Sequence, residues 1–134
     1  MGTRAAPLVS LSVKFDRTEA AINQEINCHV EAARIDSRGY GMLLGEIGLP
    51  PGAEVDRASL DAAIQKSGWQ FSRYDLLPDR LVVYLWPNDG ERVGFDFKFR
   101  PRFGLDARSA PSQLYDYYNP EARALLAPTK FVIR

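Results

Sequence analysis

The sequence is poor in the residues on which most active sites depend. Its 134 residues include one cysteine, Cys28, and one histidine, His29. A lone cysteine excludes an internal disulfide, and a lone histidine excludes most histidine-based metal sites and argues against a catalytic triad. The two residues are adjacent, but consecutive side chains of a strand point to opposite faces, so we do not expect a thiol–imidazole pair. We expect Cys28 to be buried beside Ile26 and Val30, and His29 to face solvent.

An excess of charge of one sign is also absent. Lys plus Arg (17) balances Asp plus Glu (17), which argues against a general attraction to nucleic acid or to an anionic membrane. No apolar run approaches the roughly 20 residues that span a bilayer. The first ten residues lack the apolar core of a signal peptide. The chain is therefore either cytoplasmic or a piece of a longer exported protein.

Other patterns that predict chemistry are missing as well. The carboxylates do not follow a calcium-loop spacing. The glycine string Gly39-x-Gly41-x-x-x-Gly45 enters an apolar strand instead of opening a helix, so it predicts a turn and close sheet packing, not a phosphate site. We therefore expect no catalytic residues, no cofactor and no metal ligands, and we predict that the chain is not an enzyme.

What the sequence does contain is a series of short strand patterns. Eight segments alternate apolar and polar residues or are apolar on both faces: Val9–Phe15, Ile22–Ala33, Met42–Leu49, Trp69–Tyr74, Leu81–Trp86, Val93–Phe99, Gln113–Tyr118 and Thr129–Ile133. Turn signals separate them, among them 36–39, 76–79 and 87–90. Seven or eight strands of this kind predict a mainly β fold, an antiparallel β-sandwich. We expect one domain over residues 8–134, with 1–7 a disordered lead-in or a boundary introduced by cloning.

Two strands and one helix are predicted in more detail. Met42–Leu49 is apolar on both faces and should be central, and the four apolar residues of Val93–Phe99 should anchor the core. Pro50-Pro51-Gly52 ends the first of these strands, because proline has no N–H for the ladder. A short helix follows at about 56–67, with Asp56 as N-cap and Gly68 just beyond its end. Its apolar face is narrow: Leu60, Ala63, Ile64 and Ser67.

Two clusters are candidates for binding, and each has a plainer alternative. Lys98, Arg100 and Arg102 alternate on one strand and either meet an acidic partner or form a solvated face. Tyr115, Tyr117 and Tyr118 either form a binding surface, for which tyrosine is favoured, or pack at a sheet edge.

The order of these segments resembles the C-terminal receptor-binding domain of the α2-macroglobulin family. The matching segments are the strand and turn Met42–Gly52, the strand Leu81–Leu85 in DRLVVYLW, GFDFKFRPRF at 94–103, and SAPSQLYDYYNPEARA at 109–124. Tyr115–Glu121 is the most specific of them, and the resemblance covers about residues 8–134.

The resemblance implies a role within a larger protein. Family members are large secreted or periplasmic proteins that trap proteases after cleavage of a bait region, and many attach through an internal thioester. A domain of this type would serve packing and interaction, with the neighbouring macroglobulin and thioester domains as partners and proteases reached through the parent chain. The expected localisation is extracellular or periplasmic. The thioester motif is absent here, and Cys28 does not match it. The alternative is a free-standing adhesion or ligand-binding sandwich.

The helix departs from the pattern of vertebrate members, which use lysines on this helix to bind a clearance receptor. From Arg57 to Ser67 the helix carries only Lys66, so the lysine pair is missing. This argues against receptor clearance and favours a bacterial relative. The candidate partner-binding residues are Lys66, Tyr115, Tyr117 and Tyr118, and we expect the helix side and the tyrosine strand together to face neighbouring domains.

Overall fold

The computed structural model describes residues 9–34, 41–87, 92–118 and 120–134. This part of the chain forms twelve strands and one helix. The elements are β1 (Val9–Phe15), β2 (Glu19–Ala20), β3 (Ile26–Arg34), β4 (Leu43–Gly48), β5 (Ala53–Val55), α1 (Arg57–Lys66), β6 (Phe71–Leu77), β7 (Arg80–Leu85), β8 (Arg92–Pro101), β9 (Leu105–Arg108), β10 (Ser112–Asp116), β11 (Arg123–Leu126) and β12 (Lys130–Ile133).

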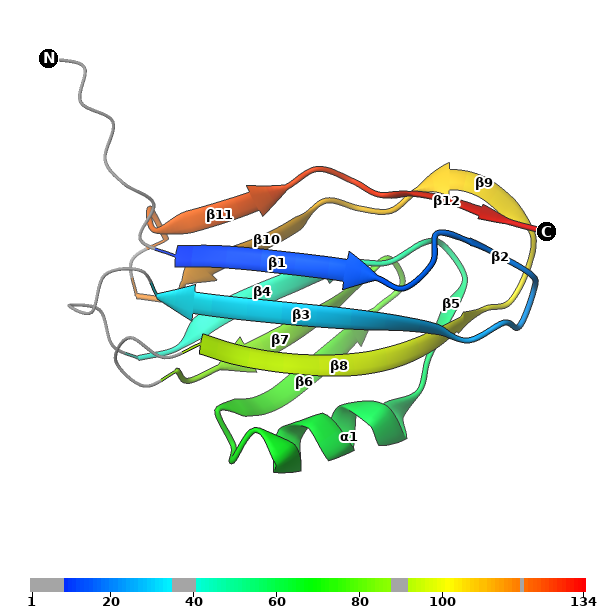
Figure 1. Ribbon diagram of the computed structural model, residues 1–134. Helices are drawn as coiled ribbons and strands as arrows, with labels where there is room; N and C mark the ends of the chain where they lie inside the picture. Colours follow the sequence, from blue (N-terminus) through cyan, green and yellow to red (C-terminus); the bar gives the residue numbers. More distant parts are fainter. Residues whose placement is uncertain (1–8, 35–40, 88–91, 119) are drawn as a thin grey trace, which may run out of the picture.

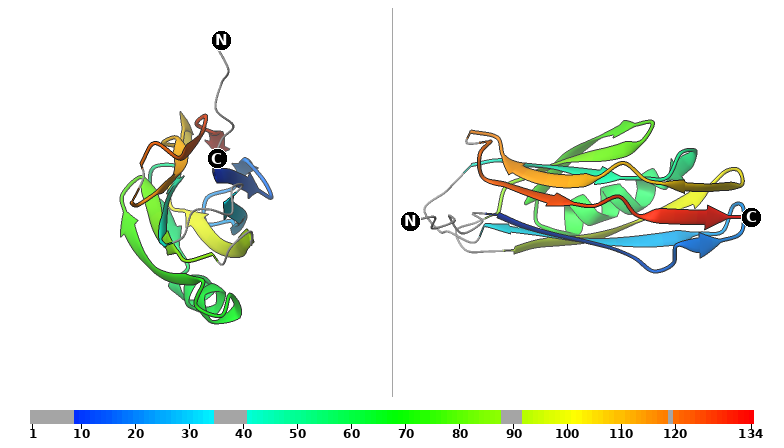
Figure 2. Two further views of the ribbon diagram at one scale, coloured as in Figure 1. Left: turned by 90° about the vertical axis from the view of Figure 1, so that its left-hand side faces the viewer. Right: turned by 90° about the horizontal axis from the view of Figure 1, so that it is seen from above.

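The strands form two large sheets that face each other and one small sheet at an end of the molecule (Figures 1 and 2). The four-stranded sheet has the order β1-β3-β8-β5, and the five-stranded sheet has the order β11-β10-β4-β7-β6. The small sheet is β2-β12-β9. The described pairings are antiparallel except that β12 runs parallel to β2. The predicted antiparallel sandwich with one short helix is confirmed, and β4 is central to its sheet as predicted.

The core lies between the two large sheets and is rich in phenylalanine. In β8 buried and exposed residues alternate strictly, and Phe95, Phe97 and Phe99 point inward as predicted. Phe131 of the small sheet packs edge-to-face against Phe15 and Phe99, with ring centroids 4.9 and 6.3 Å apart. Because each buried phenylalanine contributes roughly 1.5–3 kcal/mol, these rings hold the three sheets together.

The helix closes the open side of the sandwich between β8 and β6 (Figure 1). Asp56 caps its start, where a carboxylate oxygen accepts the Ala58 N–H at 3.0 Å. Leu60, Ala63 and Ile64 are buried, as the predicted apolar face requires. Gly68 follows the end with a φ of +66°, the left-handed conformation that glycine adopts most easily.

Several predicted boundaries were wrong. The strands β2, β5, β9 and β11, each of two to four residues, were not predicted. β3 begins at Ile26 and not at Ile22, because 21–24 form a turn in which Asn23 has a φ of +68°. β6 runs through Leu77, and β10 ends at Asp116. The predicted lead-in 1–7, the turn 36–39 and most of the turn 87–90 lie outside the described residues.

Candidate interaction face

Cys28 and His29 lie on opposite faces of β3, as predicted. Cys28 is fully buried, and burial raises the pKa of its thiol. The His29 side chain is 41% exposed, with Nδ1 2.9 Å from Asp96 Oδ1 and Nε2 3.5 Å from Glu31 Oε1. The hydrogen bond to Asp96 is the main reason that the pKa of His29 is raised. The thiol and the imidazole therefore do not form a catalytic pair.

The described residues contain no group of three or more histidine, cysteine or acidic side chains that could hold a metal ion. Among the same residues, no helix is long and apolar enough to cross a membrane.

Two hollows flank α1, with volumes of about 520 and 470 Å³. Lys66 borders the second, together with His29 and Asp96 from the outer face of the four-stranded sheet. The basic row predicted on β8 is paired within the chain. Lys98 Nζ and Arg100 Nη2 lie 3.6 and 3.5 Å from Glu25, which favours the solvated-face alternative for this row.

The outer face of the five-stranded sheet is different, because apolar side chains cover its middle. Tyr115 of β10 lies opposite Leu44 of β4, which lies opposite Tyr84 of β7. Two residues beyond the Tyr115–Leu44 pair, the Tyr117 N–H donates to the Met42 carbonyl at 3.0 Å. Trp86 directly follows the last residue of β7. We define the aromatic face as the following residues: Met42, Leu44, Tyr84, Trp86, Tyr115, Tyr117 and Tyr118.

Arginines flank this face on both sides. The guanidinium of Arg73 lies 4.4 Å from the centre of the Tyr84 ring, and that of Arg123 lies 5.5 Å from the Tyr115 ring. The Tyr84 hydroxyl donates to Asp75 at 2.8 Å, and this bond is the main cause of the raised pKa of Tyr84. An apolar centre with a charged rim is the usual anatomy of a protein–protein interface.

The most exposed part of the aromatic face is the turn after β10. Tyr117 is 52% and Tyr118 is 71% exposed. Their rings meet edge-to-face with centroids 5.3 Å apart. The Tyr118 N–H donates to Asp116 Oδ1 at 2.9 Å, which fixes the turn. Two large rings are thus held in one geometry at the surface instead of being buried.

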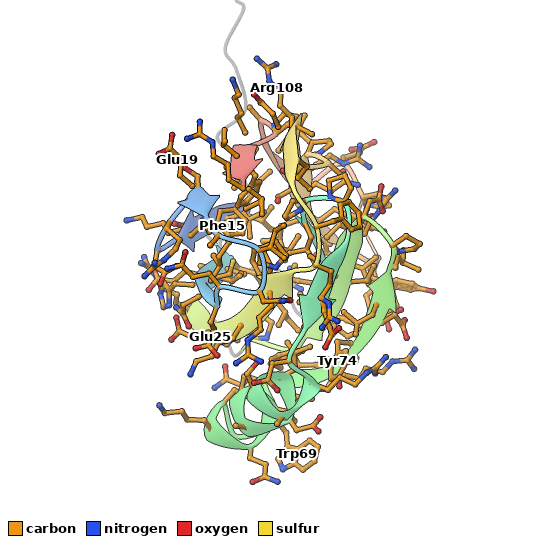
Figure 3. The ribbon with its side chains drawn as sticks, turned by 90° about the vertical axis from the view of Figure 1, so that its right-hand side faces the viewer. Phe15, Glu19, Glu25, Trp69, Tyr74 and Arg108 are labelled. Carbon is orange, nitrogen blue, oxygen red and sulfur yellow. The ribbon has the colours of Figure 1, made fainter. Side chains whose placement is uncertain are left out.

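The structure brings the three predicted tyrosines together and leaves Lys66 apart from them. The helix packs on β8 and on β6, the last strand of the five-stranded sheet, whereas β10 lies next to the opposite edge. The helix and the tyrosine strand therefore lie at different places on the domain, and the expectation that both face neighbouring domains stays a prediction. Trp69, just beyond the helix, is 66% exposed and projects away from the sandwich (Figure 3).

Sequence reasoning did not assign Leu44, Tyr84 and Trp86 to a binding face. A signal for them was present, because 42–49 and 81–86 are apolar on both sides. One side of each strand faces the core. The apolar residues on the other side lie on the outer face of the sheet, where only another protein surface would shield them from water. The two-sided pattern was interpreted only as a sign of a central strand.

These features define a β-sandwich with a helix at one edge and an aromatic face on the outer side of its five-stranded sheet. A family model described as the A-macroglobulin receptor binding domain matches residues 38–127. The chain therefore belongs to the α-macroglobulin receptor-binding domain family, and the predicted resemblance is confirmed. A search of curated proteins gives no match.

Solved bacterial structures share the fold. Native α2-macroglobulin from Escherichia coli, in a crystal structure spanning domain MG7 to the C-terminus, matches 97% of this chain with a TM-score of 0.79 and 12% identity. Salmonella α2-macroglobulin reacted with methylamine matches 96% of it with a TM-score of 0.76 and 14% identity. The chain covers 24% and 9% of those two chains. It thus corresponds in fold to the C-terminal region of much longer proteins.

Proposed function

We propose that this chain is the C-terminal domain of a larger α2-macroglobulin-like protein, in which it serves packing and interaction, not catalysis. Its aromatic face docks onto a neighbouring macroglobulin or thioester-bearing domain of the same parent. One observation carries the proposal: an apolar, aromatic centre with an arginine at each side covers a sheet face that is not part of this domain's own core.

The chemistry of the face suits a stable contact. Tyrosine and tryptophan are the residues most often found at the energetic centre of interfaces, because they offer large apolar area with few rotatable bonds. Hydrogen bonds and ring contacts hold Tyr84 and Tyr118 in place before a partner arrives. Docking therefore orders few side chains, which favours affinity.

The role of the parent follows from the family. In this proposal the parent is an exported, extracellular or periplasmic protein that traps proteases, and the domain meets proteases only through it. The single helix lysine, Lys66, argues against a clearance receptor as the partner. An immunoblot of the source organism tests the parent. A band far above the mass of a 134-residue chain in an exported fraction supports it, and a band at that mass in the cytoplasm favours the free-standing binding sandwich.

Docking is tested by titrating this chain against the preceding part of the parent, produced as a separate protein. Tyr117→Ala and Trp86→Ala should each weaken binding by about tenfold or more, the usual effect at an interface centre. Phe103→Ala is the matched control, since Phe103 is also 52% exposed but packs on Gly52, away from the aromatic face. No binding by the unmodified chain, or equal losses in all three variants, would refute the proposal.

A further inference from the structure

A buried ion pair joins the two large sheets beneath the tyrosine turn. Arg34 ends β3 in the four-stranded sheet, and Asp116 ends β10 in the five-stranded sheet. Arg34 Nη1 lies 2.6 Å from Asp116 Oδ2, and the two side chains are 3% and 8% exposed. The pair therefore sits inside the sandwich, at the end where both strands stop (Figure 1).

Each partner also holds a segment that carries part of the aromatic face. Arg34 Nη2 donates to the carbonyl of Gly41 at 2.9 Å, next to Met42. Asp116 Oδ1 accepts the Tyr118 N–H at 2.9 Å, while its own N–H donates to the Ala122 carbonyl at 3.1 Å. One ion pair thus fixes the segment before β4 and the turn after β10 relative to each other.

Direct packing between the two segments completes this arrangement. Gly41 has a φ of +101°, and a Cβ built on it would lie 2.9 Å from Cε2 of Tyr118. The Tyr118 ring therefore lies against the backbone at Gly41, where a side chain would displace it. Tyr117 hydrogen bonds to Met42 in the same two segments. The position of both rings depends on how these segments are held.

A contribution to folding stability does not by itself explain why this buried ion pair is present. Removing two charges from water costs free energy that their attraction often only offsets, and apolar replacements of buried pairs are frequently neutral. Among the described residues, Arg34 Nε is buried without a hydrogen-bond partner, which adds to that cost. The bonds to Gly41 and Tyr118, by contrast, have a clear geometric effect on the docking face.

We propose that Arg34 and Asp116 are positioning residues, which set the Tyr117–Tyr118 turn in the geometry that docks onto the neighbouring domain. This inference rests on the proposed function. Neither residue contacts the partner. They act by holding the backbone on which the two exposed rings stand.

The test replaces both charges at once, so that neither is left buried alone. In Arg34→Met/Asp116→Leu the Tyr118 N–H has no side-chain acceptor. Its amide hydrogen exchange should become at least about tenfold faster, and binding to the preceding part of the parent should weaken by about tenfold. The urea denaturation midpoint should stay close to that of the unmodified chain. The matched control is Arg102→Met/Glu54→Leu, which removes a 2.9 Å pair that is more than half exposed and far from the turn.

Gly41→Ala gives an independent route if the double variant does not fold. It keeps both charges but pushes the Tyr118 ring away, so binding should again weaken by about tenfold while Lys66→Ala leaves it unchanged. Normal binding and normal Tyr118 exchange in a folded Arg34/Asp116 variant would overturn the inference, as would binding losses that simply follow the denaturation midpoint. Failure of the unmodified chain to bind would instead refute the proposed function, and the exchange of the Tyr118 amide would still decide whether the pair holds the turn.

Discussion

Truncating Phe131 should lower the free energy of unfolding more than truncating most other core residues. It belongs to the small sheet, is fully buried, and meets Phe15 and Phe99 edge-to-face. Replacing a buried phenylalanine by alanine costs about 3–5 kcal/mol. Each aromatic pair adds about 0.5–1.5 kcal/mol beyond burial. We therefore expect Phe131→Ala to lose about 4–5 kcal/mol, a large share of the roughly 5–15 kcal/mol that stabilises a typical domain.

Urea denaturation followed by circular dichroism measures this loss. With a slope of about 2 kcal/mol per molar urea, the midpoint should fall by about 2 M. Phe103→Ala is the control, because the Phe103 side chain is 52% exposed, and it should cost about 1 kcal/mol. Hydrogen exchange should also become faster in β12 and β9. A loss below about 2 kcal/mol for Phe131→Ala, or one equal to that of the control, would refute the claim that this ring anchors the small sheet.

Three further predictions concern single side chains. Asp56→Ala removes the cap of α1 and should cost about 0.5–2 kcal/mol in denaturation experiments, whereas Asp56→Asn, which keeps an acceptor, should cost less; equal losses would contradict the cap. Cys28 should react with thiol reagents only as fast as the protein unfolds, because its thiol is buried and its pKa is raised; rapid labelling of the native protein would be the opposite result. The pKa of His29 is raised in the folded protein. Below the ordinary histidine pKa of about 6.5, its ion pairing therefore stabilises the fold fully. This contribution is lost as the pH rises through the pKa that His29 has in the folded state. The stability advantage of the unmodified chain over His29→Gln should therefore shrink between pH 5 and pH 8, and an advantage that is constant or grows would show the sign to be wrong.

Local patterns in the sequence predicted the elements that depend on local physics. The alternation through Phe95, Phe97 and Phe99 predicted the buried side of β8. Asp56 and Gly68 predicted both ends of α1, because caps involve residues within a few positions of each other. The two-residue and three-residue strands β2 and β5 carry no such pattern, and they form because longer strands lie beside them.

The site was predicted in part. The run Tyr115–Tyr118 was a candidate either for a binding surface or for packing at a sheet edge. The proposed docking face also includes Leu44 and Tyr84, which lie on strands that are separate in the sequence. The ion pair below it joins residues 82 positions apart, and neither Arg34 nor Asp116 has a neighbour in the sequence that signals a buried charge. Such a pairing is a property of the folded topology, which one sequence without its register does not reveal.

The parallel pairing of β12 with β2 has a practical consequence for handling the protein. The Arg134 N–H donates to the Ala20 carbonyl, and the Arg134 carbonyl accepts the Ile22 N–H. The last residue is thus tied into the sheet, at the end of the molecule away from the tyrosine turn (Figure 1). A dye, a biotin or a sensor surface attached through a linker after Arg134 would stand at a fixed point and leave the tyrosines facing outward. An attachment before β1 would crowd the end where they lie.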